Sequence, residues 1–227
     1  MGSIGLNNDC NELPKVFFMS IQQAYNQWAE QYDSNDNKTR DAEAIVLQTL
    51  LQDIHFHSCL EIGCGTGKNT QWLHTKANTL LGVDFSEAML QQARNKIQAP
   101  NVQFVQANIL EPWYFVQQAV DMVVFSLILE HIEDIAAIFK KAANTLQPGG
   151  YMYVGELHPF KQYTGSKARY TNENGLQVLT CYVHHLSEFL NVGMAVGFKV
   201  KRVFEYFDTD DANSVPRILG ILFQLFS

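Results

Sequence analysis

The residues most able to carry chemistry in this chain lie in a glycine-rich turn, Glu61 to Gly67, which reads EIGCGTG. An apolar run precedes this turn and a helix is expected to begin at Asn69, so the turn joins a buried strand to a helix. Glycine has no Cβ and reaches positive φ, which lets a ligand approach the backbone closely, and the helix N-terminus offers free N–H groups. A purely structural turn is the alternative for this spacing on its own. The turn is therefore a candidate ligand site.

A second predicted strand supports this site because it ends in Asp84, about twenty residues after the glycines, where a carboxylate can accept hydrogen bonds from ribose hydroxyls. Nicotinamide-dependent oxidoreductases also place an acid there, but they favour G-x-G-x-x-G spacing and rarely have a carboxylate just before the first glycine. Here Glu61 is such a carboxylate. It could orient the amides of the turn and, through them or a water molecule, meet the ammonium of an amino-acid moiety. The pattern favours a nucleoside that carries methionine, and a nicotinamide-dependent oxidoreductase stays the alternative.

Strands and helices alternate along the chain, which predicts an α/β fold with a doubly wound, mostly parallel sheet and right-handed crossovers. A helix over about 134–146 shows one apolar face, and Pro148-Gly149-Gly150 is expected to stop it before the next strand. A helix at 186–197 and two β-rich segments, 198–207 and 217–226, close the chain. The strands expected in the alternating part are 58–62, 79–83, 102–105, 122–125 and 151–154.

Two segments outside this pattern are rich in aromatic residues. Aromatic and apolar side chains recur at helical spacing from Phe17 to Tyr32, and this helix is either a stripe packed on the domain or a lid over the site. We therefore divide the chain into a tail with the helix, residues 1–38, and a domain over 39–227. An insert at about 158–185 is expected to shape a substrate pocket, because loops on a rigid scaffold usually carry specificity.

These residues resemble the class I S-adenosylmethionine-dependent methyltransferases, especially the small-molecule enzymes of the methyltransferase type 11 group, over most of the chain. The resemblance implies a Rossmann-like sheet of seven strands whose last strand runs antiparallel, a helical lid over the cofactor, and methyl transfer to an O, N or C atom of a small molecule. Beside the glycine turn and Asp84, it rests on residues 24–33, AYNQWAEQYD, 106–109, QANI, 121–131, DMVVFSLILEH, and 146–150, LQPGG.

The same resemblance implies a set of contacts to the cofactor, S-adenosylmethionine. Asp84 would hold the ribose, and Asn108 would accept a hydrogen bond from the adenine amino group; the family often has Asp there, but an amide oxygen can accept this bond too. Phe125 is bulkier than expected beside the methionine portion, so its backbone is the expected contact. Arg40 is the expected partner of the cofactor carboxylate. The contacts are Tyr25, Tyr32, Arg40, Glu61, Gly63, Cys64, Gly65, Gly67, Asp84, Phe85, Met89, Asn108, Ile109, Phe125, Ser126 and Leu127.

On the acceptor side, a sulfonium methyl is already activated, so the alignment of the nucleophile and the exclusion of water matter most. A general base helps only where the acceptor loses a proton. Glu156, His158 and His131 are the candidates for that base, because open α/β sheets bind ligands beyond the carboxyl ends of their strands. A packed or capping role is the alternative for each histidine. The candidate substrate-binding residues are Tyr163, Arg169, Tyr170 and His184.

Composition narrows the class of partner. The 227 residues carry a formal net charge of -7, so the surface gains no counterion release from a phosphate backbone, and nucleic acid is not expected as a substrate. The four cysteines lack metal-ligand spacing, and we expect no metal.

No stretch reaches the length of a membrane span and the start does not resemble a signal peptide, which favours a cytoplasmic enzyme. A protein that binds S-adenosylmethionine without transferring its methyl group is a further alternative, and the oligomeric state stays open.

Overall fold

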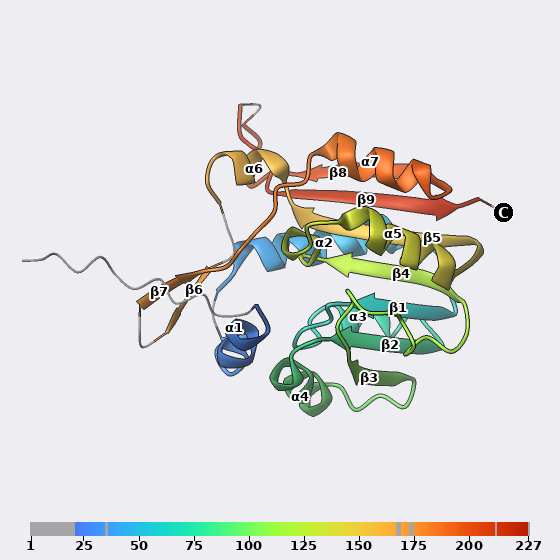
Figure 1. The fold of residues 1–227 in the computed structure, drawn as a ribbon. Coiled ribbons are helices and arrows are strands. Elements are labelled where there is room, and N and C mark those ends of the chain that lie inside the picture. The colour runs from blue at the N-terminus through green and yellow to red at the C-terminus, as the bar shows by residue number, and fades with distance from the viewer. Residues whose placement is uncertain (1–20, 35, 167–168, 173–174, 212, 227) are drawn as a thin grey trace, which may run out of the picture.

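A seven-stranded sheet forms the centre of the molecule (Figure 1). Its strands are β1 (Ser58–Ile62), β2 (Thr79–Asp84), β3 (Val102–Gln106), β4 (Val120–Ser126), β5 (Leu146–Leu157), β8 (Phe198–Tyr206) and β9 (Ile218–Leu225), and a separate hairpin holds β6 (Arg169–Asn172) and β7 (Gly175–Val178). The order is β3-β2-β1-β4-β5-β9-β8, in which β1 to β5 run parallel and β9 is antiparallel to β5 and to β8. The predicted seven-stranded, mostly parallel sheet with an antiparallel last strand is confirmed. The computed structural model describes residues 21–226 apart from 35, 167–168, 173–174 and 212.

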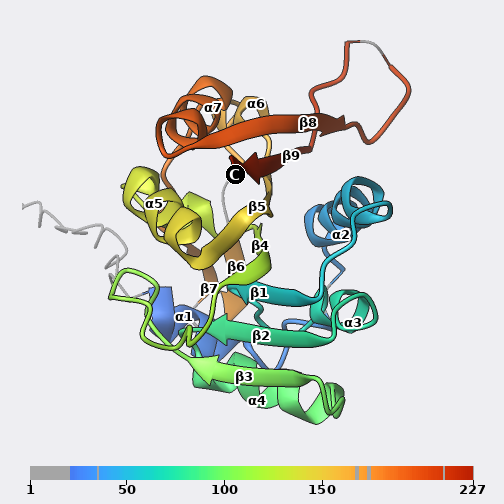
Figure 2. The same cartoon turned by 90° about the vertical axis from the view of Figure 1, so that its right-hand side faces the viewer.

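Helices cover both faces of this sheet. They are α1 (Ile21–Trp28), α2 (Lys38–Leu51), α3 (Thr70–Leu73), α4 (Glu87–Lys96), α5 (Ile135–Thr145), α6 (Pro159–Tyr163) and α7 (Leu186–Ala195), with a 3₁₀ turn, η1 (Leu129–His131). Figure 2 shows α2 and α3 on one face and α5 and α7 on the other. Side chains fix where helices begin, because Asn37 Oδ1 accepts the backbone N–H groups of Thr39 and Arg40 at the start of α2, and Ser86 Oγ accepts that of Met89 in α4. Within the described residues, no helix combines the length and the apolar character that a membrane crossing requires.

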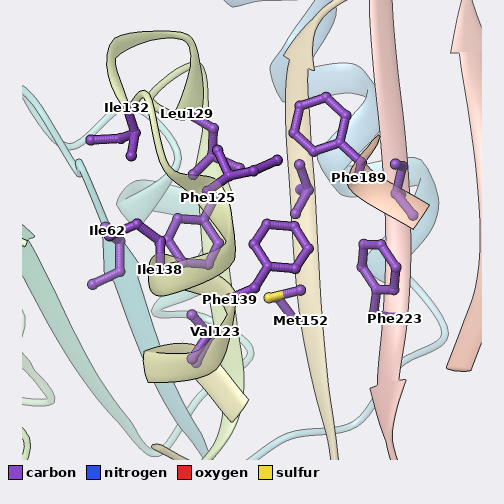
Figure 3. Packing of buried hydrophobic residues seen from close by; sticks show 14 of the residues in the cluster. Ile62, Val123, Phe125, Leu129, Ile132, Ile138, Phe139, Met152, Phe189 and Phe223 are labelled. Carbon is purple, nitrogen blue, oxygen red and sulfur yellow. The ribbon is translucent and has the colours of Figure 1, made fainter. Parts of the chain in front are cut away.

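Buried apolar side chains fill the space between the sheet and the helices. On the face of α5 and α7, the rings of Phe139 and Phe223 meet edge to face with centroids 5.8 Å apart (Figure 3). Gly193 of α7 lies so close to this cluster that a Cβ there would be 2.6 Å from the ring of Phe223. Val46 and Leu47 of α2 are fully buried in the cluster on the opposite face. This packing makes the sheet a rigid support for the residues at its edges.

The largest boundary difference from the sequence prediction concerns β5. It begins at Leu146 instead of residue 151, because Leu146 already pairs with Val120 and the register with β4 then shifts between Val120 and Met122. The segment Pro148-Gly149-Gly150 is therefore an irregular start of the strand and not a separate turn. The end of the preceding helix α5 at Thr145 agrees with the prediction. Phe17 and Phe18, expected in the aromatic helix, lie outside the described residues.

Candidate functional site

The strands β1, β2 and β4 end at the carboxyl edge of the sheet, beside α1 (Figure 1). A cavity lies at this edge. The strand order reverses between β1 and β4, and ligands of open α/β sheets bind at such a reversal. The cavity holds about 800 Å³ of space, counted with its open mouth, which lies within the range of small-molecule sites. The predicted residues that line it are Tyr25, Tyr32, Gly63, Gly65, Asp84, Phe85, Met89, Asn108, Ile109, Ser126, Leu127 and His131.

The glycine turn forms one wall of this cavity. Gly63, Gly65 and Gly67 have φ angles of 70°, 53° and 80°, in the left-handed region that favours glycine. A Cβ on Gly65 would meet no atom within 4 Å, so the space in front of this residue is open to a ligand. A Cβ on Gly67 would lie 2.7 Å from Cδ1 of Ile97. Gly65 therefore faces the cavity, whereas Gly67 permits close packing of the turn against Ile97.

Asp84 lies at the end of β2, where 8% of its surface is exposed. Its Oδ2 accepts the N–H of Gly65 at 2.9 Å, and its Oδ1 accepts the N–H of Ser86 at 2.9 Å. Burial raises the pKa of the Asp84 carboxyl to about 6, although these N–H groups act in the opposite direction. The N–H of Phe85 also donates to this carboxylate, which leaves a lone pair able to accept a hydrogen bond from a ribose hydroxyl.

A second, smaller cavity adjoins the first at the glycine turn. The two share Tyr32, Gly63, Gly65, Ser126 and Leu127, and the second also contains the predicted residues Cys64, Glu61 and Arg40. Its charged lining residues are Glu43, Glu61, Arg40 and Lys68. The Arg40 guanidinium lies 4.0 Å from the centroid of the Tyr32 ring. A lining that carries both signs of charge fits the ammonium and the carboxylate of an amino acid.

Glu61 and Glu43 are the acids of this second cavity. Glu61 Oε2 accepts the hydroxyl of Thr70 at 2.5 Å; burial, together with the charges of Glu43 and Asp84, raises its pKa to about 8. Glu43 of α2 accepts a hydrogen bond from Nδ2 of Asn69 at 2.7 Å. Sequence reasoning missed Glu43. A charged residue at a buried position of an otherwise apolar helix face was the signal that could have found it.

Polar contacts hold α1 over the first cavity. The Tyr25 hydroxyl and Nε2 of His131 lie 2.9 Å apart, and the Ser86 hydroxyl donates to Oδ1 of Asn26 at 2.6 Å. Nδ1 of His131 lies 3.2 Å from the carbonyl oxygen of Thr180, so Nδ1 carries the proton and Nε2 accepts from Tyr25. Burial raises the pKa of Tyr25 well above its ordinary value, which keeps this phenol a donor.

The other two predicted bases do not line the first cavity. Glu156 is buried in β5, and its Oε1 accepts the N–H groups of Ile128 and Leu129 at 3.0 and 2.8 Å. His158 lies 2.9 Å from Oε1 of Glu205 through Nε2, and its Nδ1 accepts the N–H of Phe160. Glu156 therefore fixes the turn after β4, and His158 fixes the start of α6.

Two of the predicted substrate residues, Tyr163 and His184, do not line the first cavity either. The Tyr163 hydroxyl contacts Nδ1 of His185 at an exposed position on α6. His184 is buried, with Nε2 2.7 Å from the carbonyl oxygen of Ile132 and Nδ1 2.9 Å from Oε1 of Glu188.

Three predicted site residues remain, which are Arg169, Tyr170 and Phe125. The side chains of Arg169 and Tyr170, in β6, lie outside the described part of the structure. The ring of Phe125 is buried in the core and points away from the edge (Figure 3). The part of the chain that the structure describes contains no group of three His, Cys, Asp or Glu side chains able to hold a metal ion.

Comparisons with known proteins agree with this geometry. A family model described as "Methyltransferase domain" matches residues 60–154. The biotin biosynthesis bifunctional protein BioHC of Cellvibrio japonicus is 29% identical over 61% of this chain and 27% of its own length. The trans-aconitate 2-methyltransferase of Escherichia coli is 30% identical over 52% of this chain and 45% of its own length. The chain thus spans less than half of these two relatives.

Among solved structures, the DhpI–SAH complex superposes with a TM-score of 0.71 at 22% identity, covering 90% of this chain and 95% of that protein. At this identity the superposition shows a shared fold. The matched segment 60–154 begins inside β1 and ends inside β5, so it contains the glycine turn, Asp84 and the strand reversal that together bound the first cavity. Residues 60–154 are therefore similar to a methyltransferase domain, and the chain shares the fold of the superposed complex.

Proposed function

We propose that this chain transfers the methyl group of S-adenosylmethionine to a small molecule. The observation that carries this proposal is the pair of joined cavities, one of which presents Asp84 while the other presents Glu61 and Arg40. A nucleoside joined to an amino acid is the class of ligand that fits both cavities at once, with Gly65 at their junction. The similarity of residues 60–154 to a methyltransferase domain supports the same donor.

Individual residues take separate parts of the donor in this proposal. Asp84 holds the ribose, and Phe85 and Met89 flank the adenine. Oδ1 of Asn108 already accepts the N–H of Leu110 at 3.0 Å, which leaves one lone pair for the adenine amino group. At the amino-acid end, the carboxylate pairs with Arg40, and the ammonium meets Glu61 directly or through the glycine turn.

S-adenosylmethionine, when bound, supplies a methyl group on a sulfonium, which leaves with its C–S electron pair remaining on sulfur. The protein's own tasks are alignment and the exclusion of water. Tyr25 and Tyr32, at α1 and just after it, close the outer side of the cavity. Of the three predicted bases, His131 lines this cavity, and because its Nε2 accepts from Tyr25, it positions the helix that covers the donor.

Two observations support a small-molecule acceptor. The curated relatives are named for trans-aconitate methylation and for biotin biosynthesis, both of which concern small metabolites. The net charge of -7 disfavours a nucleic-acid substrate. A biosynthetic role and a cytoplasmic location stay predictions.

Calorimetry with S-adenosylhomocysteine and with NADH tests the donor class. We expect saturable binding of S-adenosylhomocysteine and none of NADH. Asp84→Ala should weaken that binding about tenfold or more, because hydrogen bonds to a charged acceptor contribute roughly 1.5–3 kcal/mol each. Asp53→Ala, which removes an exposed acid at the end of α2, is the matched control and should change nothing.

The results also separate the alternatives. Binding of NADH in place of S-adenosylhomocysteine would make the chain an oxidoreductase. Binding of S-adenosylmethionine with no labelled methyl transferred to any compound in small-molecule extracts would leave a donor-binding protein without transfer.

A further inference from the structure

A third cavity, of about 1030 Å³ counted with its open mouth, opens beside the two donor cavities. Tyr32 and Leu127 line all three, so the cavities meet at these two residues. Among the described residues, Leu127 is the one non-glycine position with a positive φ, at 54°. Such a conformation is strained and persists only where the surrounding structure enforces it. The meeting point of the cavities is therefore a fixed feature of the fold.

Three cavities meet at these two residues, and a sulfonium carries three substituents, so each cavity can receive one of them. If the donor binds as proposed above, its adenosyl part and its amino-acid part occupy the first two cavities. The third substituent, the methyl group, then faces the remaining cavity at Tyr32 and Leu127. This step rests on the proposed function. It places the acceptor between α1, the start of α2 and η1, away from the cavity that contains Tyr163.

Glu130, in η1, is the acid that lines the inner part of this third cavity. Only 7% of its surface is exposed. Its Oε1 lies 4.0 Å from Nε2 of His131, and the side chains of Cys181 and Gln162 form hydrogen bonds with the carboxylate. Its Oε2, however, is buried without a hydrogen-bond partner. A buried acceptor atom without a partner is costly for the protein alone, which points to a donor supplied by a ligand.

Three aromatic rings stand beside this carboxylate. Tyr25, Trp28 and Tyr32 all line the cavity, with centroids 5.9 Å apart for Tyr25 and Trp28 and 4.8 Å apart for Trp28 and Tyr32. The faces of aromatic rings attract cations, as the guanidinium of Arg40 over the ring of Tyr32 already demonstrates. Aromatic rings around an acid are a suitable environment for a substituted ammonium group.

Three basic residues, Lys38, Arg40 and Arg217, also line the cavity. They do not cancel this preference, since Lys38 is exposed and its charge acts on Asp208. Arg217, on the rim, is neutralised locally by Asp208, whose Oδ1 accepts from the Arg217 Nε at 2.6 Å. Arg40 is directed to Tyr32 and to the amino-acid cavity. A carboxylic-acid acceptor placed with its reacting oxygen near Glu130 would meet a like charge, which disfavours it.

We propose that the third cavity is the acceptor site and that it takes a small primary or secondary amine, whose nitrogen is bound by the carboxylate of Glu130. When the nitrogen gains the methyl, an N–C bond forms, the C–S bond breaks with its electron pair left on sulfur, and the proton lost by nitrogen passes to Glu130. Burial raises the pKa of Glu130, so its carboxylate is a stronger base than an exposed glutamate. Glu130 is then a catalytic residue, whereas His131 is a positioning residue.

The test compares two probes of equal shape, benzylamine and benzyl alcohol, on protein saturated with S-adenosylhomocysteine, with dissociation constants measured by ligand-observed NMR. We expect benzylamine to bind about tenfold more tightly than benzyl alcohol, because a hydrogen bond to a charged group contributes that much. Glu130→Gln should remove this preference. Glu30→Gln removes an exposed acid just after α1 and is the matched control, which should keep it.

A second variant covers the case in which Glu130→Gln does not fold. Ser166→Trp fills the exposed mouth of the cavity without touching Glu130 and should lower benzylamine affinity while S-adenosylhomocysteine still binds normally. Equal affinities for amine and alcohol, or an amine affinity that neither Glu130→Gln nor Ser166→Trp changes, would overturn the acceptor assignment. Absence of S-adenosylhomocysteine binding in the wild-type protein would instead overturn the proposed function, so the two failures are distinguishable.

Discussion

Buried acids define this site at the residue scale, and the sequence reveals only some of them. Asp84 and Glu61 could be predicted because each has a fixed place relative to the glycine turn. Glu43 has only its place on the apolar face of α2 as a signal, and Glu130 has none, since its burial depends on elements that are distant in the chain. Glu156 is the opposite case: its place after the fifth predicted strand suggested a base, but two backbone N–H groups take up its Oε1, and no motif announces such a contact.

Glu156 should make the stability of the protein depend on pH. Burial, together with the charge of Glu130, raises its pKa from the ordinary 4.5 to about 8. Between these values the folded chain keeps a proton that the unfolded chain has lost, so the free energy of unfolding should fall as pH rises, by up to ~1.4 kcal/mol per pH unit. Glu156→Gln keeps an acceptor oxygen but cannot ionise, so urea titrations across this window should show a shallower decline for this variant.

Glu111→Gln provides the control for this measurement. Glu111 is exposed, so its substitution should leave the decline of the unfolding free energy unchanged. Part of the decline should persist in Glu156→Gln, because the buried Glu61 also has a pKa raised to about 8. An identical pH dependence in wild type and Glu156→Gln would show that Glu156 ionises as freely in the folded chain as in the unfolded one.

At the scale of elements, the central strands and helices were predictable from apolar runs and their periodicity. The starts of β1, β2 and β3 agree with the sequence prediction, whereas β5 begins earlier because an irregular pairing with β4 extends it. Apolar patterns do not encode such irregular pairings. Apolar patterns also do not reveal that α1 is held over the site by two side-chain hydrogen bonds, one between Tyr25 and His131 and one that Asn26 accepts from Ser86.

Because these polar contacts hold α1 over the proposed donor cavity, we expect donor binding to change the rate of hydrogen exchange in this helix. Hydrogen exchange measured by mass spectrometry should show slower exchange in Ile21–Trp28 when S-adenosylhomocysteine is bound, because Ile21 and Tyr25 line the donor cavity. Asn26→Ala removes the acceptor of the Ser86 hydroxyl and should speed exchange in α1 of the free protein. The helix α7, on the opposite part of the sheet, is the internal control and should not respond. Equal changes in α1 and α7 would indicate a general stabilisation and no lid.

At the scale of the whole molecule, the sheet class and the donor edge were predictable, but the division of that edge into separate cavities was not. The alternation of strands and helices predicts parallel pairing, and the glycine turn indicates the edge of the sheet at which we propose that the donor binds. The sequence also suggested that the insert shapes the acceptor pocket. That prediction stays open: Tyr163 of the insert lines a different surface cavity with His158 and Glu205, whereas Ser166 of the insert lines the third cavity together with residues of α1, the start of α2 and η1.

The packed core and the proposed donor site lie in different parts of the molecule. Substitutions at two glycines, one in each part, should therefore change stability and donor affinity separately. Gly193→Val places side-chain atoms against the ring of Phe223 in the core, far from the turn, and should lower the free energy of unfolding by about 1–3 kcal/mol through overpacking. The dissociation constant of S-adenosylhomocysteine should stay unchanged, because the turn and Asp84 are not displaced.

Gly65→Ala should show the reverse pattern. The φ of 53° at this position costs an alanine roughly 1 kcal/mol of stability. The Cβ of the alanine would project into the open space where we propose that the donor approaches the backbone. The dissociation constant of S-adenosylhomocysteine should therefore rise about tenfold or more, which equals the loss of one hydrogen bond to a charged group. Urea unfolding and calorimetry on both variants decide the matter. If Gly193→Val weakened donor binding as much as Gly65→Ala, the donor site would depend on the packing of the whole sheet, and a local site at the glycine turn would no longer account for it.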